Sequence, residues 1–250
     1  MLNLMRRKNG SPPITRLGFF HLGSDEKDDP VGSLEAEIRK REESQLENTL
    51  LVLPEAFNTR GGYYIDRPQI DQRAIPRLQT LAAERGTVFV AGIIDRVGGS
   101  NSAYLIDGKA TPELLTRKRT GGRACLYTPC KTVEDRFIPC RGVGITALIC
   151  DDAANAFGDG LRHTVARVES LMMKYSVLCI PACMRPTPAL STARRLGNSI
   201  SVVLANGDRE QHSAIVHGRQ EKIPERLDWN EIQLCDLEPE AVRGETSRQA

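Results

Sequence analysis

The sequence lacks several features that would assign it to a common class of protein. Aromatic residues make up 5% of its 250 residues, with one tryptophan, and the net charge is only +2. That charge is too small to indicate binding to nucleic acid or to an anionic membrane. No stretch approaches the roughly 20 consecutive apolar residues of a membrane-spanning helix, and the N-terminus has no apolar secretory segment. We therefore predict a cytoplasmic protein without membrane attachment.

Signatures of cofactors are missing as well. The seven cysteines are an odd number without a tight disulfide framework, which is typical of a reducing compartment. Cys125, Cys130 and Cys140 are too irregularly spaced for a zinc site, and no histidine is nearby. No nucleotide-binding loop or dinucleotide motif occurs. We predict neither a metal ion nor an organic cofactor.

Apolar runs and turn signals predict alternating strands and helices in one domain. That domain spans residues 15–243, between a basic tail over 1–14 and a polar tail over 244–250. Strands are predicted at 15–20, 49–54, 87–94, 103–106, 113–116, 144–149, 176–180, 199–204, 213–217 and 231–236. Helices are predicted at 33–48, 76–85, 161–174 and 191–196, with a long loop at 119–141. This order predicts an α/β fold in which helices cover sheets.

Three of the predicted strands end at residues that carry chemistry. Cys150 follows the apolar run 144–149, Glu55 follows the run 49–54, and Lys118 follows the segment 113–117. A thiol, a carboxylate and an ammonium are the parts of a site for acyl transfer through cysteine. In this hypothesis Glu55 takes the proton of the Cys150 thiol, and Lys118 stabilises the oxyanion together with the backbone N–H of Asp151.

The same residues resemble the motifs of the nitrilase, or carbon–nitrogen hydrolase, superfamily. The motifs occur in the order of that family, as Leu53-Pro54-Glu55 with Gly62-Tyr63, Arg117-Lys118, Ile149-Cys150-Asp151-Asp152, Ile180-Pro181-Ala182 and Ala205-Asn206. The resemblance runs from about Thr15 to Arg243, and thus over nearly the whole chain. The chain is identified on this basis as a divergent member of the superfamily.

The resemblance implies a fold and an activity. The expected fold is a four-layer α-β-β-α sandwich, and the expected assembly is a homodimer. The expected reaction is hydrolysis of a small amide or carbamoyl compound, with nitriles less favoured, by Glu55, Lys118 and Cys150. Glu134 is a candidate for a second, supporting carboxylate, and Asp152 is expected to shape the turn after the cysteine rather than to react.

Other functions remain open on the sequence. The segments that follow Cys150 differ from the family pattern, so the chain is alternatively a catalytically weak or inactive nitrilase-like domain that binds a metabolite or a partner protein. A Cys–His hydrolase using His163 has no supporting motif. Only two short basic clusters, at 117–119 and 194–195, favour binding of nucleic acid, and no aromatic residues are interleaved with them.

Overall fold

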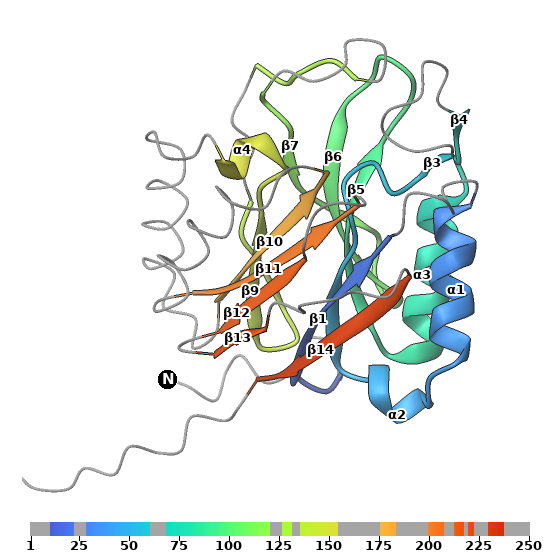
Figure 1. Ribbon diagram of the computed structural model, residues 1–250, viewed down its shortest axis with the longest axis vertical. Coiled ribbons are helices and arrows are strands. Elements are labelled where there is room, and N and C mark those ends of the chain that lie inside the picture. The colour runs from blue at the N-terminus through green and yellow to red at the C-terminus, as the bar shows by residue number, and fades with distance from the viewer. Residues whose placement is uncertain are drawn as a thin grey trace, which may run out of the picture.

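The computed structural model describes residues 11–22, 29–60, 69–120, 127–131, 136–154, 176–183, 200–207, 213–217, 220–222 and 230–237. Within them lie two six-stranded sheets (Figure 1). The first has the order β14 (Glu231–Asp236), β1 (Arg16–His21), β2 (Thr49–Val52), β5 (Val88–Ile94), β6 (Asn101–Asp107) and β7 (Glu113–Arg117). The second has the order β13 (Gln220–Lys222), β12 (Ala214–His217), β11 (Ser201–Asn206), β10 (Ser176–Ala182), β9 (Val143–Ala147) and β8 (Ile138–Cys140). A short hairpin pairs β3 (Thr59–Arg60) with β4 (Gln69–Ile70).

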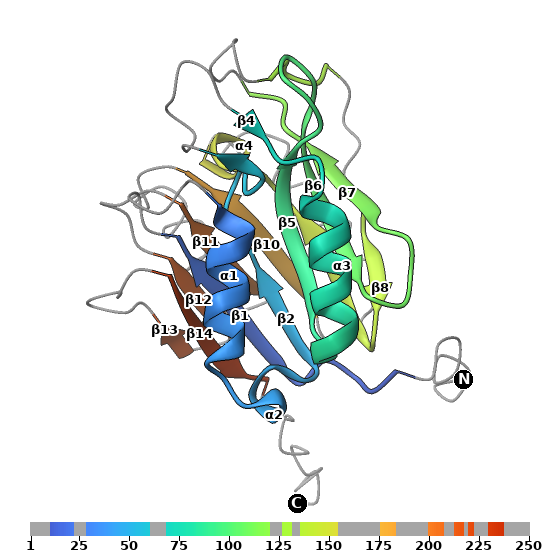
Figure 2. The same ribbon diagram turned by 90° about the vertical axis from the view of Figure 1, so that its right-hand side faces the viewer.

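Alternating apolar side chains along the strands build two hydrophobic cores. Along β2 and the residue that follows it, Leu50 and Val52 belong to the core between the sheets, whereas Leu51 and Leu53 belong to the core under the helices. Such alternation follows from the two-residue period of a strand. Helices α1 (Pro30–Arg39) and α3 (Ala74–Arg85) lie on the outer face of the first sheet (Figure 2). The predicted α/β class, with paired sheets and covering helices, is confirmed.

The direction of the central strands sets the position of the site. Strands β1, β2 and β5 run parallel to one another, as do β9, β10 and β11. The carboxyl ends of parallel strands share one edge of a sheet, where α/β proteins commonly place functional residues. Glu55 and Cys150 follow such ends, in the first and the second sheet respectively.

The first helix differs from its prediction. The sequence predicted one helix from Ser33 to about Asn48, but α1 begins at Pro30 and ends at Arg39, and the four-residue helix α2 (Glu43–Leu46) follows. The cap is Asp29, whose side chain accepts a hydrogen bond from the backbone N–H of Gly32 at 3.0 Å. An aspartate followed by proline is a favourable start for a helix, because proline suits the first helical position.

Other elements match more closely. Helix α3 begins at Ala74 and ends at Arg85, and Gly86 caps it with a left-handed φ of 63° as expected of a glycine there. Within the described part of the predicted long loop 119–141 lies a strand that was not predicted. This strand, β8, is three residues long with a proline at its centre, and it pairs antiparallel with β9.

Several predictions lie outside the described residues. These are Gly62-Tyr63, Glu134, His163, the helices at 161–174 and 191–196, the tail over 244–250 and most of the tail over 1–14. No disulfide joins the six cysteines that the structure describes. In that same part of the chain, no group of His, Cys, Asp and Glu side chains could hold a metal ion. None of the described helices has both the length and the apolar character needed to cross a membrane.

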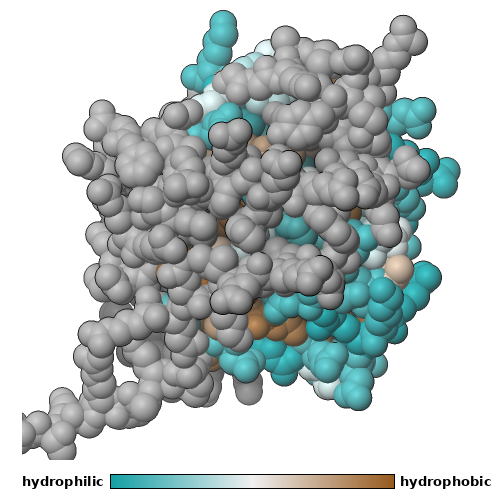
Figure 3. All heavy atoms as spheres, viewed as in Figure 1, coloured by the Kyte–Doolittle hydropathy of each residue, from teal (hydrophilic) through white to brown (hydrophobic). Residues whose placement is uncertain are grey.

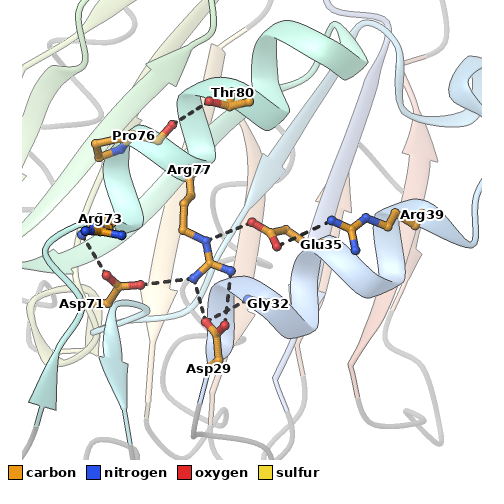
Figure 4. A network of polar contacts seen from close by, with 9 residues as sticks. All are labelled: Asp29, Gly32, Glu35, Arg39, Asp71, Arg73, Pro76, Arg77 and Thr80. Atoms are coloured by element: carbon orange, nitrogen blue, oxygen red, sulfur yellow. Dashed lines mark hydrogen bonds and ion pairs between the residues drawn. The ribbon is translucent and has the colours of Figure 1, made fainter.

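The outer surface of the described helices is polar, and charged side chains join α1 to α3. Side chains on this flank of the molecule are mostly hydrophilic (Figure 3). The guanidinium of Arg77 on α3 contacts Asp29 at 2.9 Å, Glu35 at 3.0 Å and Asp71 at 3.2 Å (Figure 4). Burial opposes ionisation of Asp29, but hydrogen bonds from Arg77 and Gly32 hold the pKa of its carboxyl below the usual value. Arg77 on α3 therefore links this helix to Asp29, the cap of α1.

Replacing Arg77 by methionine is expected to lower the free energy of unfolding by about 2 kcal/mol, because the charged hydrogen bonds of three carboxylates are lost. The measurement is urea unfolding at pH 7. Arg39→Met is the matched control: the Arg39 side chain is 74% exposed and reaches Glu35 only at 4.0 Å, so its loss should change little.

The cost should also depend on pH, because the pKa of Asp29 is lowered in the folded protein. A carboxyl of this kind stabilises the folded state above its unfolded pKa, and that contribution is lost as pH falls through the folded pKa. The cost of Arg77→Met should therefore shrink below about pH 4, and a cost equal to that of Arg39→Met would contradict the assignment.

Candidate active site

Glu55 is held in the turn that leaves β2. The backbone N–H of Leu53 donates to the carbonyl of Val90 at 2.8 Å, and that of Phe57 donates to the carbonyl of Gly92 at 2.7 Å. These bonds keep the turn against β5 on both sides of Glu55. A Cβ atom on Gly92 would lie 2.8 Å from the Cα of Glu55. Glycine at position 92 thus allows the backbone of the turn to approach the neighbouring strand.

Lys118 and Glu55 form a buried ion pair. The distance from Lys118 Nζ to Glu55 Oε1 is 2.6 Å, and the two side chains are 1% and 0% exposed. Lys118 Nζ also lies 5.3 Å from the centre of the buried Tyr127 ring. A cation at that distance over an aromatic ring is attracted to it. The ammonium is therefore fixed between a carboxylate and an aromatic face.

Asn101, the first residue of β6, contacts both members of this pair. Its side-chain Nδ2 donates to Glu55 Oε1 at 2.7 Å, and its backbone carbonyl accepts from the N–H of Lys118 at 2.8 Å. Asn101 was not among the predicted site residues, and the strand predicted at 103–106 began two residues after it. One asparagine at a strand end has no pattern that separates it from a surface residue, so its position in the site required the structure.

Cys150 lies on a sharp turn between β9 and the short helix α4 (Asp151–Ala154). Its φ is +49°, a left-handed conformation that costs free energy for a residue with a Cβ atom. Its backbone N–H donates to the carbonyl of Pro181 at 2.9 Å, and its carbonyl accepts from the N–H of Ala153 at 2.9 Å. The strained turn is thus held by bonds on both sides. It resembles the strand–turn–helix geometry that presents the nucleophile in α/β-hydrolases.

The surroundings of Cys150 favour a neutral thiol. Burial raises its pKa well above the ordinary value, and the negative charge of Glu55 raises it further. The Lys118 ammonium and the backbone N–H of Cys183 act in the opposite direction and do not compensate. Both members of the ion pair are therefore close enough to Cys150 to act on its charge. A thiol in this state needs a base to become a nucleophile.

The two aspartates after Cys150 differ in their surroundings. Asp152 is 5% exposed and accepts hydrogen bonds from the backbone N–H groups of Arg119 and Thr120, both at 2.8 Å. It therefore fastens the turn after Cys150 to the segment after Lys118. Asp151 is half-buried and opens α4.

The site lies where the two sheets meet. The carbonyl of Ala182, at the end of β10, accepts from the N–H of Glu55 at 3.4 Å and from the N–H of Gly207 at 3.0 Å. Glu55, Lys118 and Asn101 come from the first sheet, whereas Cys150, Ala182 and Gly207 come from the second. The arrangement offers a thiol, a carboxylate to move protons and a cation to hold an anion.

No protein-family model matches the sequence, and no curated protein matches it. Solved structures do match. The amidase from Nesterenkonia sp. aligns with a TM-score of 0.61 and 16% identity over 90% of both chains. A mutant of that amidase in complex with butyramide aligns with a TM-score of 0.62 and 16% identity, over 90% of this chain and 91% of the other. A CN-hydrolase superfamily protein from Xanthomonas campestris, with an arsenic adduct in its active site, aligns with a TM-score of 0.65 and 15% identity over 90% and 91%. At such identity the similarity establishes the fold.

Proposed function

We propose that the protein is a hydrolase of non-peptide carbon–nitrogen bonds and that it acts on small amides through a thioester on Cys150. The observation that carries the proposal is the buried Lys118–Glu55 pair, 2.6 Å apart and close enough to Cys150 to act on its pKa. Stability alone explains such a pair poorly, because the desolvation of two charges offsets much of their attraction. Their electrostatic influence on a strained, buried thiol supports a catalytic role for them.

The first half of the reaction forms the thioester. The Cys150 sulfur attacks the amide carbon while its proton moves to the Glu55 carboxylate. The oxygen of the tetrahedral intermediate becomes negative and is stabilised by the Lys118 ammonium and the backbone N–H of Asp151. Glu55 then returns the proton to the leaving nitrogen as the carbon–nitrogen bond breaks, and ammonia or an amine departs. One contact of the oxyanion kind typically contributes about 3 kcal/mol to transition-state stabilisation.

The second half hydrolyses the thioester. Glu55 takes a proton from water as the water oxygen attacks the thioester carbon. The carbon–sulfur bond breaks, the carboxylic acid leaves, and the proton held on Glu55 returns to the sulfur. Glu55 thus acts in turn as base, acid and base, and its charge and the Cys150 thiol are restored at the end of each cycle.

Small aliphatic amides are the first compounds to test, because a solved amidase of this fold holds butyramide in one mutant. The measurement is release of ammonia from a panel of primary amides, carbamoyl compounds and nitriles. We expect turnover of at least one amide and slower or no turnover of its matched nitrile. Turnover of the nitrile alone would overturn the choice of amides.

The binding alternative is separated by the reactivity of the thiols. Iodoacetamide should modify Cys150 faster than the other six cysteines at neutral pH, as judged by mass spectrometry of the digested protein. Base assistance by Glu55 is the reason, because burial alone slows a thiol, as it does for Cys179, whose pKa burial raises. Modification of Cys150 no faster than of Cys179, together with no ammonia release, would favour a non-catalytic domain.

A further inference from the structure

The Glu55 carboxylate is held at one of its two oxygens. Oε1 receives Lys118 Nζ at 2.6 Å and Asn101 Nδ2 at 2.7 Å. Oε2 is buried and has no hydrogen-bond partner among the described residues. A buried acceptor without a donor costs free energy, so its persistence calls for an explanation. In a site that moves protons, the oxygen that carries the proton has to be available.

Asn101 is bound in an unusual way for a buried asparagine. It is 1% exposed, and its side-chain Oδ1 has no partner among the described residues, although Nδ2 is used. Asn58 provides the contrast within the same region, since its Nδ2 donates to the carbonyl of Ile94 at 2.8 Å and its Oδ1 accepts from the N–H of Ile94 at 2.9 Å. Ile94 is also the residue that pairs with Asn101 across β5 and β6. The Asn58 side chain thus binds the backbone of Ile94, whereas the Asn101 side chain binds the carboxylate of Glu55.

Two donors fix a carboxylate where one does not. A single ammonium can be met by either oxygen as the carboxylate turns about its last bond, because that rotation is soft. A second donor, anchored at the start of a strand, restricts the rotation. The anchor is firm, because the backbone of Asn101 pairs with Ile94 and also accepts from the N–H of Lys118 at 2.8 Å.

We propose that Asn101 is a positioning residue that locks Glu55 with Oε1 on Lys118, so that Oε2 is the oxygen that exchanges protons with Cys150 and the substrate nitrogen. This inference rests on the proposed function. The proton leaves Sγ for Oε2 as the carbon–sulfur bond forms. It leaves Oε2 for the nitrogen as the carbon–nitrogen bond breaks, and Oε1 keeps both its donors throughout.

The test replaces Asn101 by leucine, which has the same number of side-chain heavy atoms but no donor, and Asn58 by leucine as the matched control. Asn101→Leu should lower kcat for the best amide by about 10- to 100-fold, the worth of one charged hydrogen bond, and should change KM little. Asn58→Leu should lower the melting temperature and leave kcat within about 3-fold of wild type. If Asn101→Leu does not fold, Asn101→Ala provides the same comparison without the added methyl groups.

A second readout needs no substrate. The rate of Cys150 alkylation by iodoacetamide is followed against pH, and Asn101→Leu should move the midpoint upward by about one pH unit. The reason is that Glu55 loses a donor that offsets part of its charge at the thiol. Asn58→Leu should leave the midpoint in place.

The outcomes separate the two proposals. Wild-type kcat and an unmoved alkylation midpoint in the Asn101 variants would overturn the role of Asn101 and leave the hydrolase intact. Failure of the wild-type protein to hydrolyse any amide would overturn the proposed function, whereas the alkylation profile would still report whether Asn101 controls Glu55. Equal losses in Asn101→Leu and Asn58→Leu would show that Asn101 is only structural.

Discussion

Replacing Cys150 by alanine is expected to abolish ammonia release, with a loss in kcat of about 10⁴- to 10⁶-fold, as is typical when a nucleophile is removed. Without the Cys150 thiol the thioester at this position cannot form, so the reaction would have to proceed by direct attack of water. The measurement is ammonia release from the best amide found in the panel, at a protein concentration high enough to detect the residual rate.

The control for this experiment is Cys179→Ala. Cys179 is fully buried in β10, and its replacement by alanine removes a thiol of the same size from the core between the sheets. It should cost stability and leave kcat close to wild type. Alanine can adopt a backbone conformation close to that of Cys150, since Ala56 has a φ of +53° against +49° for Cys150. Turnover by Cys150→Ala at more than about one hundredth of the wild-type rate would contradict the nucleophile assignment.

Replacing Lys118 by methionine is expected to have two large effects. It leaves the Glu55 charge buried and unpaired, which should lower the free energy of unfolding by about 3–5 kcal/mol. It also removes the cation proposed to hold the oxyanion, which should lower kcat by about 10²- to 10³-fold. Urea unfolding gives the first quantity and ammonia release the second.

The double variant Glu55→Gln/Lys118→Met separates these effects. Removing both charges should recover most of the lost stability, because no buried charge remains unpaired. It should recover none of the activity, since the base is gone as well. A double variant that regains turnover would contradict the assigned roles, and one that remains as unstable as Lys118→Met would show that the pair does not account for the loss.

The positions of the candidate residues could be predicted because each follows the end of a segment predicted to be a strand. Glu55, Lys118 and Cys150 all stand at such ends, and parallel strands bring their ends to one edge. Their assembly across two sheets depends on how the sheets face each other, which periodicity does not specify. The role proposed for Asn101 could not be predicted for a similar reason. Only its hydrogen bond to Glu55 Oε1, 2.7 Å away, distinguishes it from other asparagines, and that contact depends on the tertiary structure.

The errors have local causes. The first helix was predicted to begin at Ser33 because serine is a common cap residue. Asp29-Pro30, directly upstream, is the stronger start signal, since aspartate caps the helix and proline suits its first position. Strand β8 was missed because it is three residues long and contains Pro139, which cannot donate to a sheet. Substrate identity could not be predicted because it depends on the side chains that line the site. The homodimer stays a prediction because it depends on the outer surface. Neither follows from the pattern that builds the core.

The hydrogen bonds of the Ala182 carbonyl have a consequence for the unfolding of the protein. Glu55 follows a strand of the first sheet and Cys150 follows a strand of the second. A state in which the two sheets separate would therefore keep its strands but lose catalytic activity. Under mild denaturant, turnover should therefore disappear before circular dichroism registers a change. The rate of ammonia release would then report whether the two sheets are packed against each other.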